Sequence, residues 1–331
     1  MIIALDAMGG DLAPQATVAG AVQALASYDD LELILTGDEQ RLSSELSEHE
    51  FPTDRLTIEP AASVVAMGES PTAALKEKKD SSITRAVMLV KEGRADALVS
   101  AGNTGAQMAT SLMILGRIKG VSRPAIGSFF PAIDSTPLIL DVGANADLKP
   151  RNLLEFAVMG DLVQRITQPI DNPTVGLLSI GEEPSKGNEL TVEANKLLSD
   201  FPAINFHGNI EGGDILTGVV DVVVCDGFVG NIVLKFAESI GRYVSRKLLK
   251  PMLVDLDEDT REQLSQKFTS LSRDLSYEEY GGAPLLGVNG VSIITHGAAT
   301  PRAIHNSIRE ARLLVKENLV TRIAETLDEE N

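Results

Sequence analysis

The chain has 331 residues, of which 44% are hydrophobic, and its formal net charge is −18. This composition is typical of a folded globular protein, and the negative charge argues against nonspecific binding to nucleic acid, which needs a basic surface. The single cysteine, Cys225, excludes an internal disulfide, and no apolar run reaches the roughly 18 residues of a membrane span. The first residues lack the pattern of a secretory signal, so we expect a cytoplasmic protein.

Short β-branched runs alternate with helical patterns along the chain, which predicts an α/β fold with a mostly parallel sheet flanked by helices. In chain order, the predicted strands cover residues 2–5, 31–36, 95–100, 137–141, 174–179, 219–225 and 291–295. The predicted helices cover residues 14–27, 71–78, 82–92, 104–116, 151–166, 188–199, 230–249 and 301–325. A further helix is predicted over 257–276, because its apolar side chains share one helical stripe, made of Leu264, Phe268, Leu271 and Leu275.

Glycine-rich polar loops follow six of the predicted strands. Their sequences are DAMGGD (6–11), AGNTGA (101–106), VGANADLKP (142–150), IGEEPSKGNE (180–189), DGFVGN (226–231) and HGAATP (296–301). Because the carboxyl ends of parallel strands meet at one edge of a sheet, we expect these loops to share one edge and to form one polar crevice. Helices that begin there would present unpaired N–H groups to phosphate or carboxylate.

The chemistry of these loops excludes several kinds of site. None matches the phosphate-binding loop of nucleotide-binding proteins or the dinucleotide fingerprint, and no zinc pattern or nucleophile elbow is present. Cys225 ends an apolar strand, where we expect a buried structural side chain. We predict no metal site and no cofactor.

The polar side chains of the loops suit a site that holds an anion while it reacts directly. Lys186 would hold negative charge, Asn231 would stabilise an oxyanion, and His296 or Asp226 would move a proton. The predicted phosphate- or acyl-binding residues are Ser100, Gly102, Asn103, Thr104, Gly105, Asp141, Asn145 and Asn188.

Positive charge gathers in one place, within residues 235–250. This stretch has five lysines and arginines against the single acid Glu238; they are Lys235, Arg242, Arg246, Lys247 and Lys250. Two interpretations remain open, a solvated helix face or a docking patch for an acidic protein or an anionic membrane.

Four segments together resemble the phosphate acyltransferase family of bacterial phospholipid synthesis, the acyl-carrier-protein:phosphate transacylases. They are ALDAMGGDLAP, SAGNTGA, GEEPSKGNE and CDGFVGNIVLK, and the resemblance runs in order along the whole chain. It implies transfer of a long-chain acyl group from acyl carrier protein to inorganic phosphate. The product would be an acyl phosphate, which a downstream glycerol-3-phosphate acyltransferase uses.

The chain is also distantly similar to phosphotransacetylases. Asp226 and Asn231 match an Asp and an Asn of that family, whereas His296 and Gly297 stand where its Ser-Arg pair would fall. The general base and a phosphate-binding arginine are therefore not assigned by this similarity. It implies a Rossmann-like two-lobed architecture, related to isocitrate dehydrogenase, with the active site between the lobes.

For the mechanism, we expect phosphate to react directly with the acyl thioester. Phosphate would sit on helix starts and Lys186, oriented by Asn188 and the AGNTG turn, and would attack the thioester without an acyl-enzyme. A backbone N–H with Asn231 or Asn145 would hold the oxyanion. We expect one α/β catalytic domain over 1–331, undivided or in two lobes, with an amphipathic helical insertion at about 235–285.

The resemblance also implies that this insertion mediates homodimerisation, peripheral binding to the inner face of an anionic membrane, or both. The residues predicted to do so are Arg246, Lys247, Leu264, Phe268, Leu271 and Leu275. Two other functions stay open, a nicotinamide-dependent hydroxy-acid dehydrogenase on a related fold and a non-enzymatic scaffold at the membrane surface.

Overall fold

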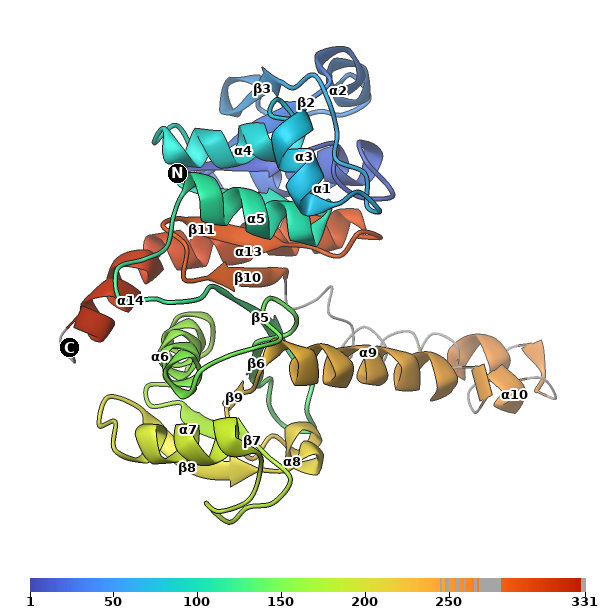
Figure 1. Ribbon diagram of the computed structural model, residues 1–331. Helices are drawn as coiled ribbons and strands as arrows, with labels where there is room; N and C mark the ends of the chain where they lie inside the picture. The colour runs from blue at the N-terminus through green and yellow to red at the C-terminus, as the bar shows by residue number, and fades with distance from the viewer. Residues whose placement is uncertain are drawn as a thin grey trace.

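The computed structural model describes residues 1–244, 246–247, 250–253, 256–258, 260–264, 267 and 281–328 (Figure 1). The strands are β1 (Ile2–Asp6), β2 (Glu32–Gly37), β3 (Leu56–Pro60), β4 (Ala97–Ser100), β5 (Ala125–Phe129), β6 (Leu138–Leu140), β7 (Thr174–Leu178), β8 (Asn205–Ile210), β9 (Val222–Val224), β10 (Ala283–Leu286) and β11 (Val291–Ile294). The helices are α1 (Gln15–Ser27), α2 (Glu39–Leu46), α3 (Pro71–Glu77), α4 (Ser82–Lys91), α5 (Thr104–Ile114), α6 (Pro150–Thr167), α7 (Glu189–Ser199), α8 (Gly212–Thr217), α9 (Gly227–Val244), α10 (Lys250–Met252), α13 (Pro301–Lys316) and α14 (Leu319–Asp328).

All seven predicted strands are confirmed, within a few residues at each end. Four further strands lie outside these seven predicted ranges, namely β3, β5, β8 and β10. Strand β8 is largely polar and β10 contains Pro284, so neither shows the β-branched run that marks a strand in sequence. Because β10 belongs to the sheet, the prediction that the helical insertion continues to about residue 285 is wrong at its end.

The predicted helices are also present, with one correction. The segment 301–325 forms two helices, α13 and α14, because Asn318 between them has a φ of 53°. The helix predicted over 257–276 lies largely outside the described residues. No helix in the described part of the chain is long and apolar enough to cross a membrane.

The strands form an 11-stranded sheet over the described residues, in the order β3-β2-β1-β4-β11-β10-β5-β6-β9-β7-β8. The strands β3, β2, β1, β4 and β11 are parallel to one another, and so are β6, β9, β7 and β8. We call these parallel groups, with their helices, the first lobe and the second lobe. Between them, β10 and β5 run antiparallel to their neighbours.

This arrangement corrects the expectation that all strand ends share one edge. The chain direction reverses three times across the sheet, between β11 and β10, between β10 and β5, and between β5 and β6. Because three is an odd number, the parallel strands of the two lobes run in opposite directions. The six polar loops therefore fall into two groups of three, one group for each lobe.

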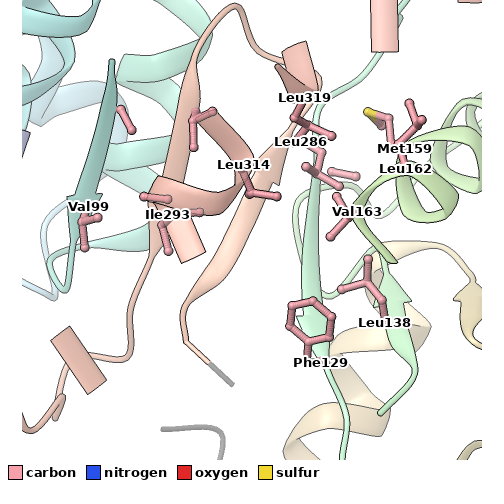
Figure 2. Packing of buried hydrophobic residues seen from close by; sticks show 14 of the residues in the cluster. Val99, Phe129, Leu138, Met159, Leu162, Val163, Leu286, Ile293, Leu314 and Leu319 are labelled. Atoms are coloured by element: carbon pink, nitrogen blue, oxygen red, sulfur yellow. The ribbon is translucent and has the colours of Figure 1, made fainter. Parts of the chain in front are cut away.

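The lobes share continuous cores on both faces of the sheet. Alternate side chains of β1 point to opposite faces, so that Ile3 belongs to the core on the side of α1 and α13, while Ala4 belongs to the core on the side of α4. Figure 2 shows the first of these cores crossing the boundary between the lobes, where Leu286, Leu314 and Leu319 lie near Met159 and Val163 of α6. The boundary is therefore packed as a protein interior, which fixes the loops of the two lobes relative to each other.

Candidate active site

The three loops of the first lobe are joined to one another. The Asp11 backbone N–H donates to the Gly297 carbonyl at 2.7 Å, which ties the loop after β1 to the loop after β11. Below them, the buried Ser100 hydroxyl donates to Asp6 Oδ2 at 2.7 Å and accepts from the Gly102 N–H at 3.0 Å. Ser100 thus supports the loop between β4 and α5 from beneath.

Asn103 holds the start of α5 and a neighbouring segment in place. Its side-chain oxygen accepts from the Ala106 N–H at 2.9 Å, and so caps the helix. Its Nδ2 atom donates to carbonyls of the adjacent segment, including Ala66 at 3.1 Å and Glu69 at 3.0 Å. Both ends of this amide are used within the protein, whereas the next residue, Thr104, is exposed at the first turn of α5.

In the second lobe, Asp141 organises the loop after β6. It is fully buried, and its carboxyl accepts hydrogen bonds from backbone N–H groups of the surrounding chain, among them Ile126, Gly143 and Ala144. Asn145 donates to the same carboxyl through its Nδ2 atom at 2.9 Å and to the Pro124 carbonyl at 2.7 Å. Both hydrogens of the Asn145 amide are therefore engaged, which leaves Asn231 as the better candidate for an oxyanion.

The glycines of the DGFVGN loop let α9 begin directly on top of this organised loop. A Cβ atom at Gly230 would lie 1.9 Å from the Asp141 carbonyl oxygen, and one at Gly227 would lie 2.7 Å from Asp141 Oδ2. The Gly227 N–H donates to the Asn145 carbonyl at 2.8 Å. This close approach explains why two glycines follow the apolar strand here.

A cavity of about 390 Å³ lies between the lobes. It brings together three of the predicted site residues, Thr104 and His296 from the first lobe and Asn231 from the second. His296 is exposed, and its Nδ1 atom accepts from the Ala298 N–H at 3.2 Å, so a proton on the neutral ring would be on Nε2. The sequence analysis missed other polar side chains that line this cavity, namely Asp11, Ser128, Lys235, Glu238 and Thr295.

Some of those missed residues had a signal in the sequence. Asp11 ends the first polar loop and Lys235 begins the basic stretch, whereas Ser128 lies in the unpredicted strand β5. The apolar part of the wall consists of Met67, Ile126, Phe129, Val142, Leu234, Ala283 and Ile294. The cavity therefore offers polar groups beside an apolar wall.

A second cavity, of about 370 Å³, lies where β7 and β9 end in the second lobe. Asn188 and Asp226 line it, and they cap α7 and α9 by accepting from the Thr191 and Val229 N–H groups, each at 2.9 Å. Lys186 is exposed in the preceding loop and lines neither cavity. Of the predicted site residues, Thr104, His296 and Asn231 thus line the cavity between the lobes, whereas Asn188 and Asp226 line the second cavity.

Burial is the main influence on the titration of the acids beneath these loops. It raises the pKa of Asp6, although the hydrogen bond from Ser100 partly offsets the effect. Burial also raises the pKa of Asp141, against the hydrogen bonds that this carboxyl accepts. The pKa of the Cys225 thiol is raised by burial and by the nearby carboxylates of Asp226 and Asp141, so this thiol is unsuited to act as a nucleophile at neutral pH.

Helix α9 projects beyond the two lobes in Figure 1. It carries a stripe of exposed large apolar side chains, which we call the α9 stripe, made of Phe228, Val229, Ile232, Phe236, Ile240 and Tyr243. Beyond it, Arg246 and Lys247 are exposed and Leu264 is half-buried. The predicted residues Phe268, Leu271 and Leu275 lie outside the described residues.

Within the described part of the chain, no group of three or more His, Cys, Asp or Glu side chains is arranged to hold a metal ion.

Comparison with known proteins relates nearly the whole chain to one protein family. Residues 1–322 match the family model described as fatty acid synthesis protein. A phosphate acyltransferase from Halothermothrix orenii is 48% identical over 335 residues, covering 100% of this chain and 99% of that protein. One from Heliobacterium modesticaldum is 51% identical over 332 residues, covering 98% of this chain and 97% of the relative.

Solved structures show the same fold at low sequence identity. A phosphotransacetylase from Streptococcus pyogenes aligns with a TM-score of 0.64 at 19% identity, covering 96% of this chain and 94% of its own. A 4-hydroxythreonine-4-phosphate dehydrogenase from Klebsiella pneumoniae aligns with a TM-score of 0.53 at 13% identity, covering 95% of this chain and 99% of its own. The same fold thus occurs in a phosphotransacetylase and in a dehydrogenase, so the fold alone does not identify the reaction.

Proposed function

The chain belongs to the fatty acid synthesis protein family and is a phosphate acyltransferase, and we propose that it transfers a long-chain fatty acyl group from acyl carrier protein to inorganic phosphate. The acyl phosphate formed would then serve a glycerol-3-phosphate acyltransferase in phospholipid synthesis. Family membership favours this reaction over both alternatives, the dehydrogenase and the non-enzymatic scaffold.

The cavity between the lobes is the observation that carries this proposal. It combines the start of α5 at Thr104, the imidazole of His296 and the amide of Asn231 with an apolar wall. A helix start suits an anion such as phosphate, and an apolar wall suits the first carbons of an acyl chain. A fatty acyl thioester and phosphate could therefore meet there.

In the proposed reaction, a phosphate oxygen attacks the thioester carbonyl carbon while phosphate rests at the start of α5. The Asn231 amide donates to the oxyanion that develops on the carbonyl oxygen. The carbon–sulfur bond then breaks, and the thiolate of the carrier's prosthetic group leaves and takes up a proton. His296 donates that proton from Nε2, the nitrogen that carries hydrogen in the neutral ring, and regains a proton from the hydrogen phosphate that has attacked.

The other predicted site residues have supporting roles in this proposal. Ser100, Gly102, Asn103 and Gly105 shape the loop that presents Thr104, while Asp141 and Asn145 shape the loop beneath Asn231. Asp226 and Asn188 cap the helices of the second lobe. Lys186 remains a prediction as a phosphate ligand, and it would have to act from outside the cavity between the lobes.

We propose that the protein is a homodimer joined through the α9 stripe. Six large apolar side chains on one projecting helix form an exposed patch that a monomer would hold in water at a cost in free energy. A second copy of the same helix would cover it by a two-fold interface, because the patch is apolar on both copies.

We propose further that the protein binds peripherally to the cytoplasmic face of an anionic membrane. The support is the pair Arg246 and Lys247, which are exposed beyond the end of α9 on a chain that is otherwise strongly acidic. Binding to phosphatidylglycerol vesicles that weakens with added salt would support this part of the proposal, and salt-independent or absent binding would count against it.

The reaction itself is tested by identifying its product. The protein is mixed with palmitoyl acyl carrier protein and inorganic phosphate, and phosphorus NMR is used to find an acyl phosphate signal. Intact-mass spectrometry of the protein without phosphate shows whether an acyl-enzyme accumulates. We expect palmitoyl phosphate and no acylated protein; a stable acyl-enzyme would refute direct attack by phosphate.

A further inference from the structure

The second cavity lies in the second lobe, apart from the cavity between the lobes. It has a volume of about 370 Å³ and lies where β7 and β9 end and α7 and α9 begin. Its apolar lining consists of Leu153, Leu178, Ile180, Leu190 and Val229. Ile180 is 80% exposed, so an apolar side chain stands at the mouth and the cavity opens to the surface beside it.

Several polar side chains of the lining make hydrogen bonds to backbone groups. Ser179 donates to the Lys186 carbonyl at 3.0 Å, and Thr191 donates to the Asn188 carbonyl at 3.0 Å. Asn188 and Asp226 accept from the helix N–H groups that they cap. The Cys225 thiol donates to the Asp141 carbonyl at 3.6 Å.

This engagement decides what kind of ligand the cavity suits. The hydroxyls of Ser179 and Thr191 and the Cys225 thiol already donate to backbone carbonyls, so they offer no free donor to a ligand. Among the residues that the structure describes, no lysine, arginine or histidine lines the cavity, and its charged lining residue is Asp226, so an anion such as phosphate is disfavoured. An uncharged apolar group remains as the ligand class.

The volume suits a chain rather than a small group. An apolar cavity of roughly 150 Å³ holds one benzene molecule. The second cavity is more than twice that size, so it has room for a methylene chain of about a dozen carbons.

Within the wall of the second cavity, Gly187 has a φ of 116°, and a Cβ there would lie 2.0 Å from Thr191 Oγ1. A glycine is therefore needed to keep the loop folded against α7.

Helix α9 connects this cavity with the proposed reaction site. Val229 lines the second cavity, and Asn231, two residues further along the same helix, lines the cavity between the lobes. The two cavities therefore lie on different sides of the first turns of one helix, which is about 10 Å across. A long acyl chain can cover such a distance, whereas a short one cannot.

We propose that the second cavity is the subsite for the distal, methyl end of the fatty acyl chain. The inference rests on the proposed function, because it needs an acyl substrate whose carbonyl reacts near Asn231. Burial of each further methylene group in the cavity would then favour long-chain over short-chain substrates. The subsite would make Leu190, Val229 and Ile180 determinants of chain-length preference.

The test compares two acyl chain lengths in variants of α7. Leu190→Trp fills the cavity, and Leu197→Trp places the same side chain on the same helix, at a position that is 41% exposed and lines neither cavity. The rates of acyl phosphate formation from palmitoyl and butyryl carrier protein are measured for each. We expect Leu190→Trp to lower the palmitoyl-to-butyryl ratio about tenfold, the loss of about two buried methylene groups, and Leu197→Trp to leave it unchanged.

A second variant, Leu190→Ala, keeps the test informative if Leu190→Trp does not fold. Leu190→Ala removes apolar contacts without filling the cavity, and it should raise the KM for the palmitoyl substrate more than for the butyryl substrate. Equilibrium dialysis with radiolabelled palmitate gives a direct readout, and binding should weaken in Leu190→Trp but not in Leu197→Trp. Folding of each variant is checked by its thermal unfolding.

The outcomes separate this inference from the proposed function. If the unaltered protein forms no acyl phosphate at either chain length, the proposed function fails. If it forms acyl phosphate but both Leu190 variants change the two substrates equally, the reaction stands and the subsite is refuted. If Leu190→Trp shifts the monomer–dimer equilibrium while the chain-length ratio stays constant, a side chain of a second copy occupies the cavity and the inference is overturned.

Discussion

At the scale of single residues, glycines set how closely α9 approaches the loop after β6. Gly230 has no room for a side chain, since its Cβ would lie 1.9 Å from the Asp141 carbonyl oxygen. We expect Gly230→Ala to lower the free energy of unfolding by about 1–3 kcal/mol, because the first turn of α9 must shift. Urea denaturation measures this.

The matched control lies in the same helix. A Cβ at Gly241 would meet no atom within 4 Å, so Gly241→Ala should be neutral or stabilise by up to about 1 kcal/mol through helix propensity. Equal losses of stability in the two variants would show that crowding at Gly230 is not the cause.

Glu310 on α13 gives a prediction about pH. It is 2% exposed, and neither carboxyl oxygen has a hydrogen-bond partner of ordinary geometry in the described structure. Burial raises its pKa well above the usual range, and the charge of Arg309 and the Gly282 backbone offset this only in part. The folded state therefore holds this proton more tightly than the unfolded state, so its contribution to stability is full below about pH 4.5 and is lost as the pH rises through the folded-state pKa.

The variant Glu310→Gln removes this titration. Its Tm should exceed that of the unaltered protein at about pH 8, and the difference should shrink toward about pH 4.5. Glu325→Gln makes the same substitution at an exposed position of α14 and serves as the control. A Tm difference that is the same at all pH values, or that also occurs in Glu325→Gln, would contradict the buried-acid explanation.

The prediction for catalysis concerns the side chain of Asn231. Replacing it with Ala removes the proposed donor to the oxyanion and should lower kcat about 10²–10³-fold with little effect on folding, because the side chain is exposed. Steady-state rates at saturating phosphate measure this. The control is Asn188→Ala, which removes a helix cap on the second lobe; it should mainly reduce stability, and a comparable loss of kcat would argue against a specific role for Asn231.

At the scale of elements, the sequence predicted the helices and strands whose pattern of apolar residues can be recognised within the segment itself. The buried strands β1, β2 and β9 are apolar runs bounded by glycine or an acid, and such runs are recognised without tertiary information. The polar edge strand β8 and the proline-containing strand β10 are stabilised by pairing with β7, β11 and β5, which no local pattern records.

The prediction at the scale of elements concerns dimerisation through helix α9. If the α9 stripe joins two copies of the chain, Phe236→Glu should convert the dimer to a monomer, because it buries a charge without a partner at the interface. Sedimentation equilibrium measures the change. Leu197→Glu, which places the same charge on an exposed position of α7, should leave the dimer intact. A monomeric unaltered protein, or a dimer that survives Phe236→Glu, would contradict the interface.

At the scale of the whole molecule, the site depends on the direction of strands that are far apart in sequence. The polar loops were recognised from their composition, yet their division into two groups follows from the three antiparallel pairings around β10 and β5. One of those pairings, between β10 and β5, brings together residues about 160 positions apart, as in Ile126 with Leu285. This is why Thr104, His296 and Asn231 meet in one cavity, whereas Asp226 and Asn188 line another.

The most direct test of the central claim is the release of free thiol from palmitoyl acyl carrier protein, followed with and without inorganic phosphate. We predict that release requires phosphate, and that a hydroxylamine-sensitive acyl phosphate forms in equal amount. Release that is indifferent to phosphate, or no release at all, would contradict acyl transfer to phosphate in the cavity between the lobes.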